Sequence, residues 1–301
     1  MHPPIADTPQ GVPTEHRHLL QKTSPLEGHL SGELVSVIMP TYNGASLMES
    51  SIRSVLSQSY HHLELLITDD HSTSQQTLAI LHRYERLDER VKVEYLAENS
   101  GPAFARNHAI RRARGRYFAF CDSDDQWKPD KLERQLRMMS VCQCALSFSS
   151  YIVRGEDNTV KGIVRAPHRL TYSQLKRDNK IGCSTAIYDT RLLGSKYFMP
   201  QLQKRQDWGL FLSIMEQCNV AYAVESPLSY YTVRRGSVSS SKCSLVKYNV
   251  AVYRQVLHFS PAKSWLYFLG IFMPTHLLKV VRKRYDSFFF LRHRHGHQHP
   301  E

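Results

Sequence analysis

Three aspartates gather within four positions where an apolar stretch of the sequence ends. Residues 118–121 have the character of a buried strand and lead directly into Asp122, Asp124 and Asp125. Carboxylates this close repel one another, and the repulsion costs free energy unless a cation or solvent screens it. Oxygen ligands of this kind suit a hard divalent cation. The alternative is an acidic turn that caps a helix beginning near Pro129.

Two other segments also end in polar residues. An apolar run over residues 34–39 is followed by Pro40, Thr41, Tyr42 and Asn43, and a run over residues 63–68 is followed by Asp69 and Asp70. In open α/β sheets, ligands gather outside the carboxyl ends of the strands. We therefore expect the polar residues at these three strand ends to converge on one crevice.

Strand-like and helix-like segments alternate through the first half of the chain. Strands are predicted over residues 34–39, 63–68, 91–96 and 116–120, and helices over 45–58, 75–87 and 102–114. The first strand is expected to end at Pro40, because proline donates no hydrogen bond to a sheet. This alternation predicts an α/β fold with a mostly parallel central sheet. Neither G-x-G-x-x-G nor G-x-x-x-x-G-K-[ST] occurs, which disfavours an ordinary dinucleotide fold and a P-loop.

Composition restricts the class of protein and of partner. The 301 residues are 42% hydrophobic and 22% charged, as in a soluble protein that buries a core. The formal net charge of +12 favours an acidic partner such as a nucleotide, an anionic membrane or nucleic acid. Six cysteines without a C-x-x-C pair, and no long apolar run after Met1, indicate a reducing, cytosolic setting.

A series of motifs resembles glycosyltransferase family 2, the inverting enzymes with a glycosyltransferase A fold. The motifs are VSVIMPTYNGASLMESSIRSVLSQSY, LELLITDDHST, ENSGPAFARNHAI, DSDDQWKPDKLERQL, RQDWGLFL and YYTVRRGSVSSSK. The resemblance covers about residues 34–253 and is closest to bacterial enzymes of teichuronic acid, capsule and exopolysaccharide assembly. It implies a Rossmann-like domain with a mixed sheet extension, and transfer from a UDP-sugar, or another nucleotide sugar, to a lipid-linked or polysaccharide acceptor.

The same resemblance suggests how the chain is divided. Residues 1–33, rich in Pro, His, Gly and Thr, are expected to form a flexible extension. Residues 34–256 would form the catalytic domain, with a nucleotide-sugar-binding half over 34–140 and an acceptor-binding half over 141–256. Residues 257–301 would form basic, apolar C-terminal helices and a histidine-rich tail.

The resemblance assigns roles to the acidic turn. It implies that Asp125 binds a divalent cation, Mg²⁺ or Mn²⁺, that Asp124 binds the ribose side of the donor, and that Asp122 supports the metal cluster. The chemistry agrees, because a leaving diphosphate gains negative charge that a hard cation on one or two carboxylates can neutralise.

The resemblance also assigns the nucleoside base to the first two strand ends. Asp70 would accept a hydrogen bond from a pyrimidine, usually uracil, in a charge-assisted bond that gives orientation. Tyr42 would stack on the base, and Pro40, Thr41 and Asn43 would shape the loop around it. The alternative is that residues 69–73 form a strand-to-helix turn in which Asp or Ser caps the next helix, and both interpretations can hold together.

Three arginines are candidates for contact with the donor. Arg106 faces the donor in family members, and its alternative is a surface charge on a basic helix. Arg234 and Arg235 lie in the flexible segment VRRGSVSSSK and could clamp the diphosphate, because guanidinium matches phosphate oxygens bidentately. The alternative for both is a solvated surface loop.

Asp207 is the candidate general base. Inverting transfer needs the acceptor hydroxyl to lose its proton as it attacks the anomeric carbon, and one carboxylate within hydrogen-bond reach is the minimal device. Asp207 stands at the start of an amphipathic helix, so the alternative is that it only caps this helix. Many members of the family carry Glu-Asp where this chain has Gln206 and Asp207.

The C-terminal segment is apolar and basic at once. The run WLYFLGIFMPTHLLKVV is interrupted by Gly270, Pro274, His276 and Lys279, which favours two short interfacial helices over a membrane-spanning helix. Because residues 282–284 are all basic, we expect a peripheral location on the cytoplasmic face of the inner membrane. The alternative is a tail helix packed on the catalytic domain.

Other functions compete with sugar transfer. A nucleotidyltransferase also uses carboxylate-bound metal, but no triphosphate-binding glycine loop is present. A basic protein of the membrane surface, or a catalytically degenerate protein that only binds nucleotide sugar, remains the alternative. A nucleic-acid partner is not expected, because the basic residues are scattered and no zinc-finger or RRM motif occurs.

Overall fold

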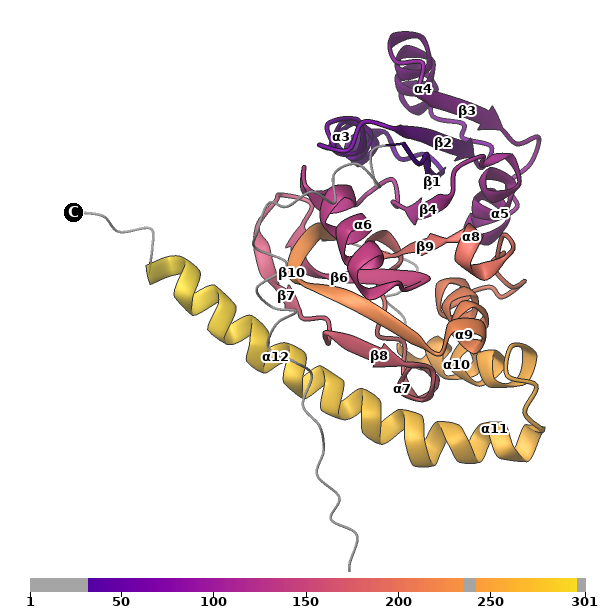
Figure 1. Ribbon diagram of the computed structural model, residues 1–301, viewed down its shortest axis with the longest axis vertical. Coiled ribbons are helices and arrows are strands. Elements are labelled where there is room, and N and C mark those ends of the chain that lie inside the picture. The colour runs from indigo at the N-terminus through magenta and orange to yellow at the C-terminus, as the bar shows by residue number, and fades with distance from the viewer. Residues whose placement is uncertain (1–31, 235–241, 297–301) are drawn as a thin grey trace, which may run out of the picture.

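The computed structural model describes residues 32–234 and 242–296, and one large sheet forms its centre (Figure 1). The N-terminal half consists of β1 (Val35–Thr41), α3 (Ala45–Leu56), β2 (Leu63–Asp69), α4 (Gln75–Leu87), β3 (Val91–Tyr95), α5 (Pro102–Arg112) and β4 (Tyr117–Phe120). Strands β3, β2, β1 and β4 are neighbours in this order, and all three pairings are parallel. Helical connections between parallel strands bring all four carboxyl ends to the same edge of the sheet.

The second half extends this sheet with strands of both directions. It consists of β5 (Gln126–Trp127), α6 (Lys131–Cys142), β6 (Leu146–Gly155), β7 (Val160–Val164), β8 (Arg169–Thr171), α7 (Tyr172–Arg177), η1 (Cys183–Thr185), β9 (Ile187–Asp189), α8 (Thr190–Leu193), α9 (Gln206–Cys218), β10 (Val220–Val233) and α10 (Lys242–Gln255). Strand β9 runs antiparallel to both β4 and β6, and β10 runs parallel to β6. The extension is therefore mixed, as the sequence predicts.

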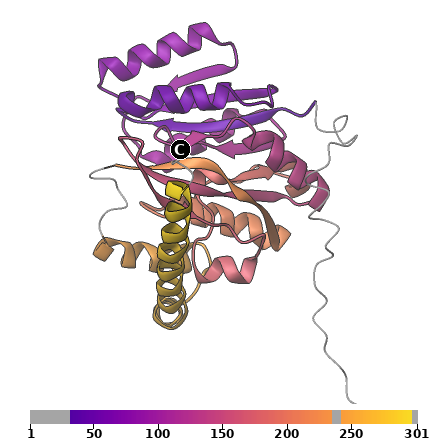
Figure 2. The same cartoon turned by 90° about the vertical axis from the view of Figure 1, so that its left-hand side faces the viewer.

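Alternating side chains of the central strands feed two cores on opposite faces of the sheet. Val37 and Met39 of β1 pack with apolar residues of α3, α4 and α6, whereas Ile38 packs with residues of α5 and α9. A parallel strand covered by helices on both faces is apolar at nearly every position, which explains the continuous run in this part of the sequence. The later helices α9 to α12, orange to yellow, lie together on one side of the molecule (Figure 2).

Strand β1 continues through Pro40, so the prediction that it ends there is wrong. The carbonyl of Ile38 accepts the N–H of Cys121 beyond the end of β4, so even-numbered residues of β1 point their backbone groups toward β4. The pairing of β1 with β4 ends at Ile38, while the pairing with β2 reaches Thr41. The nitrogen of Pro40 faces the side of β4, but β4 no longer pairs with β1 at this position. The missing N–H of Pro40 therefore breaks no hydrogen bond between the two strands.

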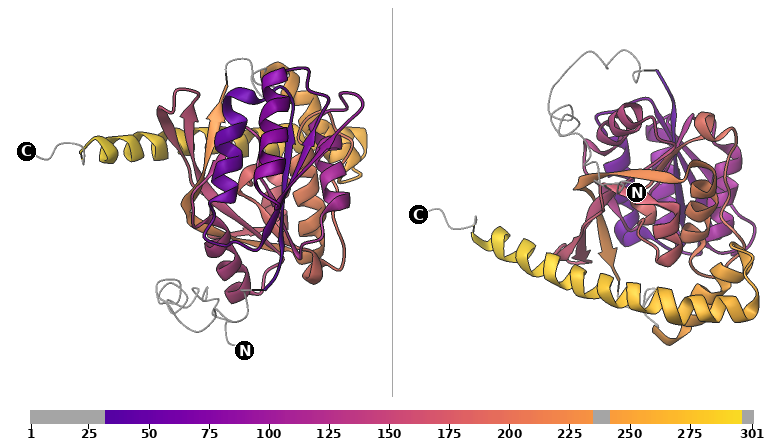
Figure 3. Two further views of the ribbon diagram at one scale, coloured as in Figure 1. Left: turned by 90° about the horizontal axis from the view of Figure 1, so that it is seen from above. Right: turned by 60° about the horizontal axis from the view of Figure 1, so that its bottom comes forward.

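The C-terminal segment forms one continuous helical run rather than two short helices. It consists of α11 (Pro261–Tyr267), a π-helical turn η2 (Phe268–Phe272) and α12 (Met273–Gly296). Pro274 lacks an N–H, and the wider π turn directly before it absorbs the interruption without a break. The run projects beyond the body of the domain (Figure 3). By length and composition alone, residues Pro261–His293 would suffice to cross a membrane.

Part of this run packs on the catalytic domain, as the tail-helix alternative expects. Phe268 and Phe272 are buried in the core that contains α9. Ser287 Oγ donates to the Ile163 carbonyl (3.2 Å) and accepts the Ile163 N–H (3.1 Å) on β7. A Cβ on Gly162 would lie 2.3 Å from Ser287 Oγ, so only glycine permits this close approach.

The N-terminal boundary lies close to the predicted one. Residues 1–31 of the expected extension lie outside the described residues. Glu33, however, already forms ion pairs with Arg116 (3.0 Å) and Arg191 (2.7 Å), so this glutamate belongs to the folded domain.

Candidate active site

Asn43 ties the loop after β1 to the loop after β2. Its Oδ1 accepts hydrogen bonds from the backbone N–H groups of Thr73 (3.0 Å) and Ser74 (2.9 Å), and its own N–H donates to Ser72 Oγ (2.8 Å). Asn43 adopts a left-handed backbone conformation with φ of 48°, which asparagine tolerates better than most residues. The first two strand ends are thus held together as one rim.

The other predicted residues at the end of β1, Pro40, Thr41 and Tyr42, differ in exposure. Pro40 and Thr41 are buried, and Thr41 Oγ1 lies 3.2 Å from Met48 Sδ. Tyr42 is 50% exposed, which leaves its ring accessible for stacking on a planar ligand. Of these residues, Tyr42 therefore offers an exposed ring, while Pro40 and Thr41 form the buried base of the loop.

Asp70 is buried and organises the loop before α5. Its Oδ1 accepts the N–H of Ser100 and its Oδ2 accepts the N–H of Gly101, both at 2.8 Å. Each oxygen keeps a second lone pair that a nucleoside base could use. Capping of α4 falls instead to Ser74, whose side chain accepts the N–H of Thr77. The capping and binding interpretations of this turn therefore concern different residues.

The three aspartates of the acidic turn each have a different partner. Asp122 Oδ1 pairs with the Arg106 guanidinium, and Asp124 Oδ2 lies 2.9 Å from Arg234 Nε. Asp125 is only 2% exposed and accepts the N–H of Thr232 at 3.0 Å and the hydroxyl of Ser184. The helix that follows, α6, has Asp130 at its N-cap and no capping side chain, so the acidic turn does not serve as a helix cap.

Charge crowding persists in spite of these partners. Burial, followed by the charge of Asp122, raises the pKa of Asp124, although Arg234 and Arg106 act in the opposite direction. Burial, followed by the charges of Asp124 and Asp122, raises the pKa of Asp125 well above its ordinary value. The fold therefore holds these carboxylates together against their repulsion, which is typical of functional sites.

Arg106 is a buried member of the site rather than a surface charge. Burial works against its charge, but Asp122, Cys183 and Asp207 together raise the pKa of the guanidinium above its ordinary value. Arg234 is half-buried beside Asp124. Arg235 lies outside the described residues.

Asp207 lies in the first turn of α9, but it is not the helix cap. The N-cap is Arg205, and no side chain caps this helix. Asn179 Nδ2 instead donates to Asp207 Oδ2 at 3.1 Å, and Asp207 is half-buried. The sequence alternative of a simple capping aspartate therefore does not apply.

Segment 179–184 links the acidic turn to Asp207. Ser184 Oγ accepts the N–H of Asp122 at 3.1 Å and donates to Asp125, and Asn179 donates to Asp207. Cys183 lies within this segment. Burial raises the pKa of its thiol well above the ordinary value, and the charges that act on it are those of Arg106, Asp122, Asp207 and Asp125. These residues come from α5, the turn after β4 and α9, which are far apart in the sequence. The fold brings them together.

Several residues of this site gave no signal in the sequence. Ser184 and Thr232 bind Asp125, and Asn179 binds Asp207. All of them lie in the second half of the chain. Asn179 and Ser184 fall outside every motif, and Thr232 lies within YYTVRRGSVSSSK, where the motif assigns it no role. Their neighbours in space are set by the antiparallel strand β9 and the strand pair β6 and β10.

The donor atoms of the acidic turn fit a hard divalent cation. In residues 32–234 and 242–296, no group of three His, Cys, Asp or Glu side chains is arranged to enclose a metal ion. Enclosure is not needed, because Mg²⁺ and related ions are often held by one or two carboxylates together with substrate phosphates. Asp122 and Asp124 keep 26% and 27% of their side-chain surface exposed, and Asp125 lies beneath them with one free lone pair on each oxygen.

A parallel α/β sheet with carboxylates and arginines gathered outside its strand ends defines a nucleotide-handling α/β protein. The glycosyl transferase family 2 model matches residues 36–198. The chain belongs to this family, and it is a glycosyltransferase.

Relatives match over most of their own length. The putative teichuronic acid biosynthesis glycosyltransferase TuaG of Bacillus subtilis is 44% identical over 237 residues, which is 78% of this chain and 93% of TuaG. The Escherichia coli UDP-Glc:alpha-D-GlcNAc-diphosphoundecaprenol beta-1,3-glucosyltransferase WfgD is 37% identical over 216 residues, which is 71% of this chain and 83% of WfgD. These matches confirm the family resemblance that the motifs indicate.

Solved structures confirm the predicted glycosyltransferase A fold. Residues 1–349 of TarS from S. aureus, in complex with UDP-GlcNAc, superpose with a TM-score of 0.63 at 23% identity, covering 79% of this chain and 71% of that one. The mannosyltransferase PcManGT from Pyrobaculum calidifontis, in complex with GDP-Man and Mn²⁺, gives a TM-score of 0.57 at 20% identity and covers 83% and 73%.

Proposed function

We propose that this glycosyltransferase moves a sugar from a UDP-sugar to a lipid-linked or polysaccharide acceptor during assembly of a bacterial cell-surface polysaccharide. The names of TuaG and WfgD and the UDP-GlcNAc bound by TarS support this donor and acceptor class. The observation that carries the proposal is that segment 179–184 contacts both parts of the site: Ser184 bonds to Asp122 and Asp125, and Asn179 bonds to Asp207.

The donor lies along the carboxyl ends of β1, β2 and β4. Tyr42 stacks on the uracil, and Asp70 accepts the imide N–H with a lone pair not used by the loop before α5. Asp124 contacts the ribose, and Arg106, Arg234 and Arg235 bind the diphosphate. When bound by Asp125 and Asp122, Mg²⁺ or Mn²⁺ would neutralise charge on the leaving diphosphate, and the Mn²⁺ in the PcManGT complex supports this requirement.

The acceptor approaches from the side of Asp207. Its hydroxyl oxygen attacks the anomeric carbon from the face opposite the diphosphate, and the bond to the diphosphate breaks as the new glycosidic bond forms. The hydroxyl proton passes to Asp207, which Asn179 holds in place at 3.1 Å. Direct displacement of this kind inverts the anomeric configuration.

We assign the reaction to the cytoplasmic face of the inner membrane. An acceptor carried on undecaprenol, as in the name of WfgD, is confined to a membrane, and this proposal requires the enzyme to work at its surface. The apolar and basic C-terminal run provides a physical basis for that location.

The proposal is tested by UDP release and by UDP binding in the same three variants. With Mn²⁺ and a panel of UDP-sugars, Asp207→Asn should lower kcat about 10³-fold, as expected for loss of a general base. UDP binding, measured by calorimetry, should stay at the wild-type value in Asp207→Asn but should weaken at least about tenfold in Asp125→Ala. The exposed Asp157→Asn serves as the matched control and should change neither value.

Three results would count against the proposal. Full turnover in Asp207→Asn would remove this residue as the base. Saturable binding of UDP without turnover by the wild-type protein, for every donor and acceptor supplied, would instead indicate a degenerate member of the family. Retention of the donor's anomeric configuration in the product, read by NMR, would contradict the inverting displacement.

A further inference from the structure

After the buried Phe268 and Phe272, the part of the helical run that forms α12 has polar side chains against the protein. Lys279 Nζ lies 2.9 Å from Asp178 Oδ2, and His276 lies 3.7 Å from the other oxygen of the same carboxylate. Farther along, Ser287 bonds to both backbone groups of Ile163. A surface helix of a soluble domain normally directs such residues toward water and its apolar stripe toward the core.

The opposite side of the run is apolar and open to solvent. Six side chains form what we call the outward stripe, each between 59% and 74% exposed: Leu266, Leu269, Leu277, Leu278, Val281 and Phe288. Within α12 the spacing of residues 277, 278, 281 and 288 places them on one face, since each residue turns the helix by about 100°. Contiguous exposed apolar surface of this kind marks an interaction site.

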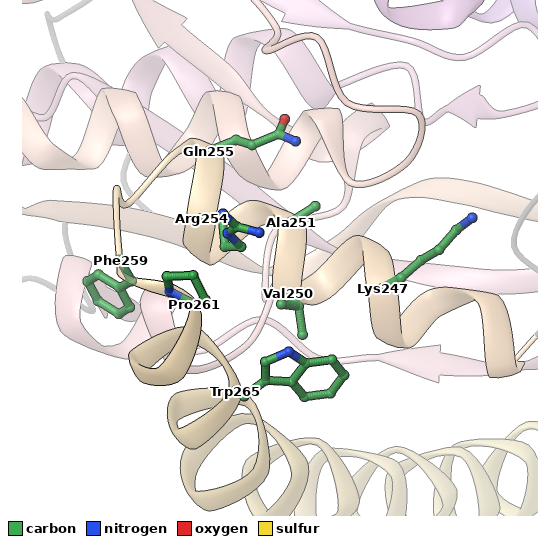
Figure 4. A pocket seen from close by; sticks show the side chains of 8 residues that line it. All are labelled: Lys247, Val250, Ala251, Arg254, Gln255, Phe259, Pro261 and Trp265. Carbon is green, nitrogen blue, oxygen red and sulfur yellow. The ribbon is translucent and has the colours of Figure 1, made fainter.

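Cations border the outward stripe. Arg282 and Arg284, both exposed, follow Val281 in the sequence, and at about 100° per residue they fall on the two flanks of the stripe. At the start of the run, Trp265 lines a hollow of about 510 Å³ between α10 and α11, whose wall also includes Lys247 and Arg254 (Figure 4). Apolar surface with cations along its edge complements a bilayer with anionic headgroups.

We infer that the outward stripe docks the protein on an anionic phospholipid bilayer, with α11 and α12 lying in the plane of its surface. Trp265 and Tyr285, both largely exposed, sit at headgroup depth, where amphipathic aromatic rings are favoured. The inference rests on the membrane location proposed above and deepens it, because it names the surface that makes the contact and its orientation; this surface contains none of the catalytic candidates.

The contacts of the inner side explain why the run lies on the membrane rather than across it. Phe268 and Phe272 are part of the domain core, and Lys279 and Ser287 bond to the domain over several turns. A spanning helix would have to release these contacts and bury Lys279, Arg282 and Asp286 in hydrocarbon. The in-plane arrangement keeps every one of these bonds.

The experiment compares binding of the full-length protein to sedimented vesicles. Wild-type protein should bind vesicles of phosphatidylglycerol and phosphatidylcholine, and should bind pure phosphatidylcholine at least about tenfold more weakly at low salt. Leu278→Glu with Val281→Glu should lower binding to the anionic vesicles at least about tenfold. The matched control is Leu87→Glu on α4, because Leu87 is 72% and Leu278 71% exposed, and it should bind like wild type.

The same measurements distinguish the inference from its alternatives. If the bound fraction of the double variant equals that of wild type, the inference is overturned. If wild-type protein ignores the vesicles but sediments as a dimer that the double variant dissociates, a second copy covers the stripe instead. If protein bound to vesicles resists an alkaline carbonate wash, the run spans the bilayer. Calorimetric binding of UDP with Mn²⁺ should be the same in all variants, which separates this test from that of the proposed reaction.

Discussion

At the scale of single residues, the site is defined by how each carboxylate is restrained. Asp70 is held by two backbone N–H groups, Asp122 by Arg106, Asp125 by Ser184 and Thr232, and Asp207 by Asn179. A carboxylate fixed in this way loses little further freedom when it binds a ligand. Each carboxylate of the candidate site is therefore held in one orientation.

Lys131 is the residue whose environment is least expected from the sequence. It is fully buried, and within the described part of the chain its Nζ has no hydrogen-bond partner. The ammonium lies 4.0 Å from the centroid of the Trp127 ring. Burial lowers the pKa of Lys131 to about 7, against a weaker opposite effect of Cys121.

This burial predicts a pH dependence of stability that Lys131→Met should remove. Between about pH 7 and the ordinary lysine pKa, the unfolded chain binds a proton at this position that the folded chain does not, so stability rises with pH. We compare the free energy of unfolding of Lys131→Met with that of wild type. The difference should favour the variant more at pH 6 to 7 than at pH 9, and it should fall by at most about 1.4 kcal/mol per pH unit. Urea unfolding of both proteins across this range measures the difference. A constant difference at all pH values would show that Lys131 stays protonated in the fold.

At the scale of elements, α12 is connected to the candidate base. Lys279 donates to the Asn179 carbonyl and pairs with Asp178, and the Asn179 side chain donates to Asp207 at 3.1 Å. Burial works against the charge of Asp178, but His276 and Lys279 together lower its pKa. The C-terminal helix α12 thus contacts residues 178 and 179, and Asn179 in turn bonds to Asp207.

This connection predicts that Asn179 and Lys279 act as positioning residues. Asn179→Ala should lower kcat about tenfold, the cost of one lost hydrogen bond of about 1.4 kcal/mol, while KM for the UDP-sugar stays unchanged. Lys279→Met should act in the same direction but more weakly. The matched control is Arg282→Met, which removes an exposed cation from the same helix.

Steady-state kinetics with a soluble acceptor measure both parameters without the membrane. An equal change in kcat, KM and melting temperature would indicate general damage to the fold rather than positioning of Asp207. Wild-type kcat in Asn179→Ala would show that Asp207 needs no support from this segment.

At the scale of the whole molecule, the acidic turn is an exception in a basic protein. The chain has 39 Lys and Arg against 27 Asp and Glu, and the buried aspartates of the site lie among these cations. A protein of this charge attracts nucleotides and anionic surfaces alike. Our two proposals assign this charge two different partners, a nucleotide sugar at the carboxyl edge of the sheet and an anionic bilayer at the outward stripe.

Ligand removal should reveal the metal requirement in the stability of the whole domain. UDP at about 100 times its Kd, with Mn²⁺, should raise the free energy of unfolding by about 2.7 kcal/mol, and EDTA should reverse the rise. GDP with Mn²⁺ is the matched ligand control and should raise it less, because Tyr42 and Asp70 select a pyrimidine. A thermal melt with each nucleotide measures the effect. Equal stabilisation by UDP in EDTA would remove the metal from the binding model.

The N-terminal half could be predicted closely from the sequence, because its elements are specified locally. Periodicity and strand-end polarity place α4 over Gln75–Leu87 and Asp70 at the end of β2, as observed. The prediction that β1 ends at Pro40 was wrong because a proline interrupts a strand only where a neighbouring strand needs its N–H. Whether β4 needs it depends on how far β4 pairs with β1, which the sequence does not show.

The second half was less predictable, because its contacts join distant segments. Ser184 meets Asp125 across 59 residues, Thr232 meets it across 107, and Lys279 reaches Asn179 across 100. No local pattern marks these partners. The helical run α11–α12 shows the same limit, since an apolar and basic sequence does not indicate which side of a helix the domain will cover.

The sequence by itself determined the class of fold, the family and the acidic and aromatic residues of the site, because short-range spacing and residue type encode them. Only the tertiary structure decided that segment 179–184 contacts both Asp207 and the acidic turn, that Lys279 bonds to Asn179 in this segment, and that the polar side of α12 faces the domain. These arrangements depend on sheet topology and on packing between segments distant in the chain, and neither is written in any local stretch of residues.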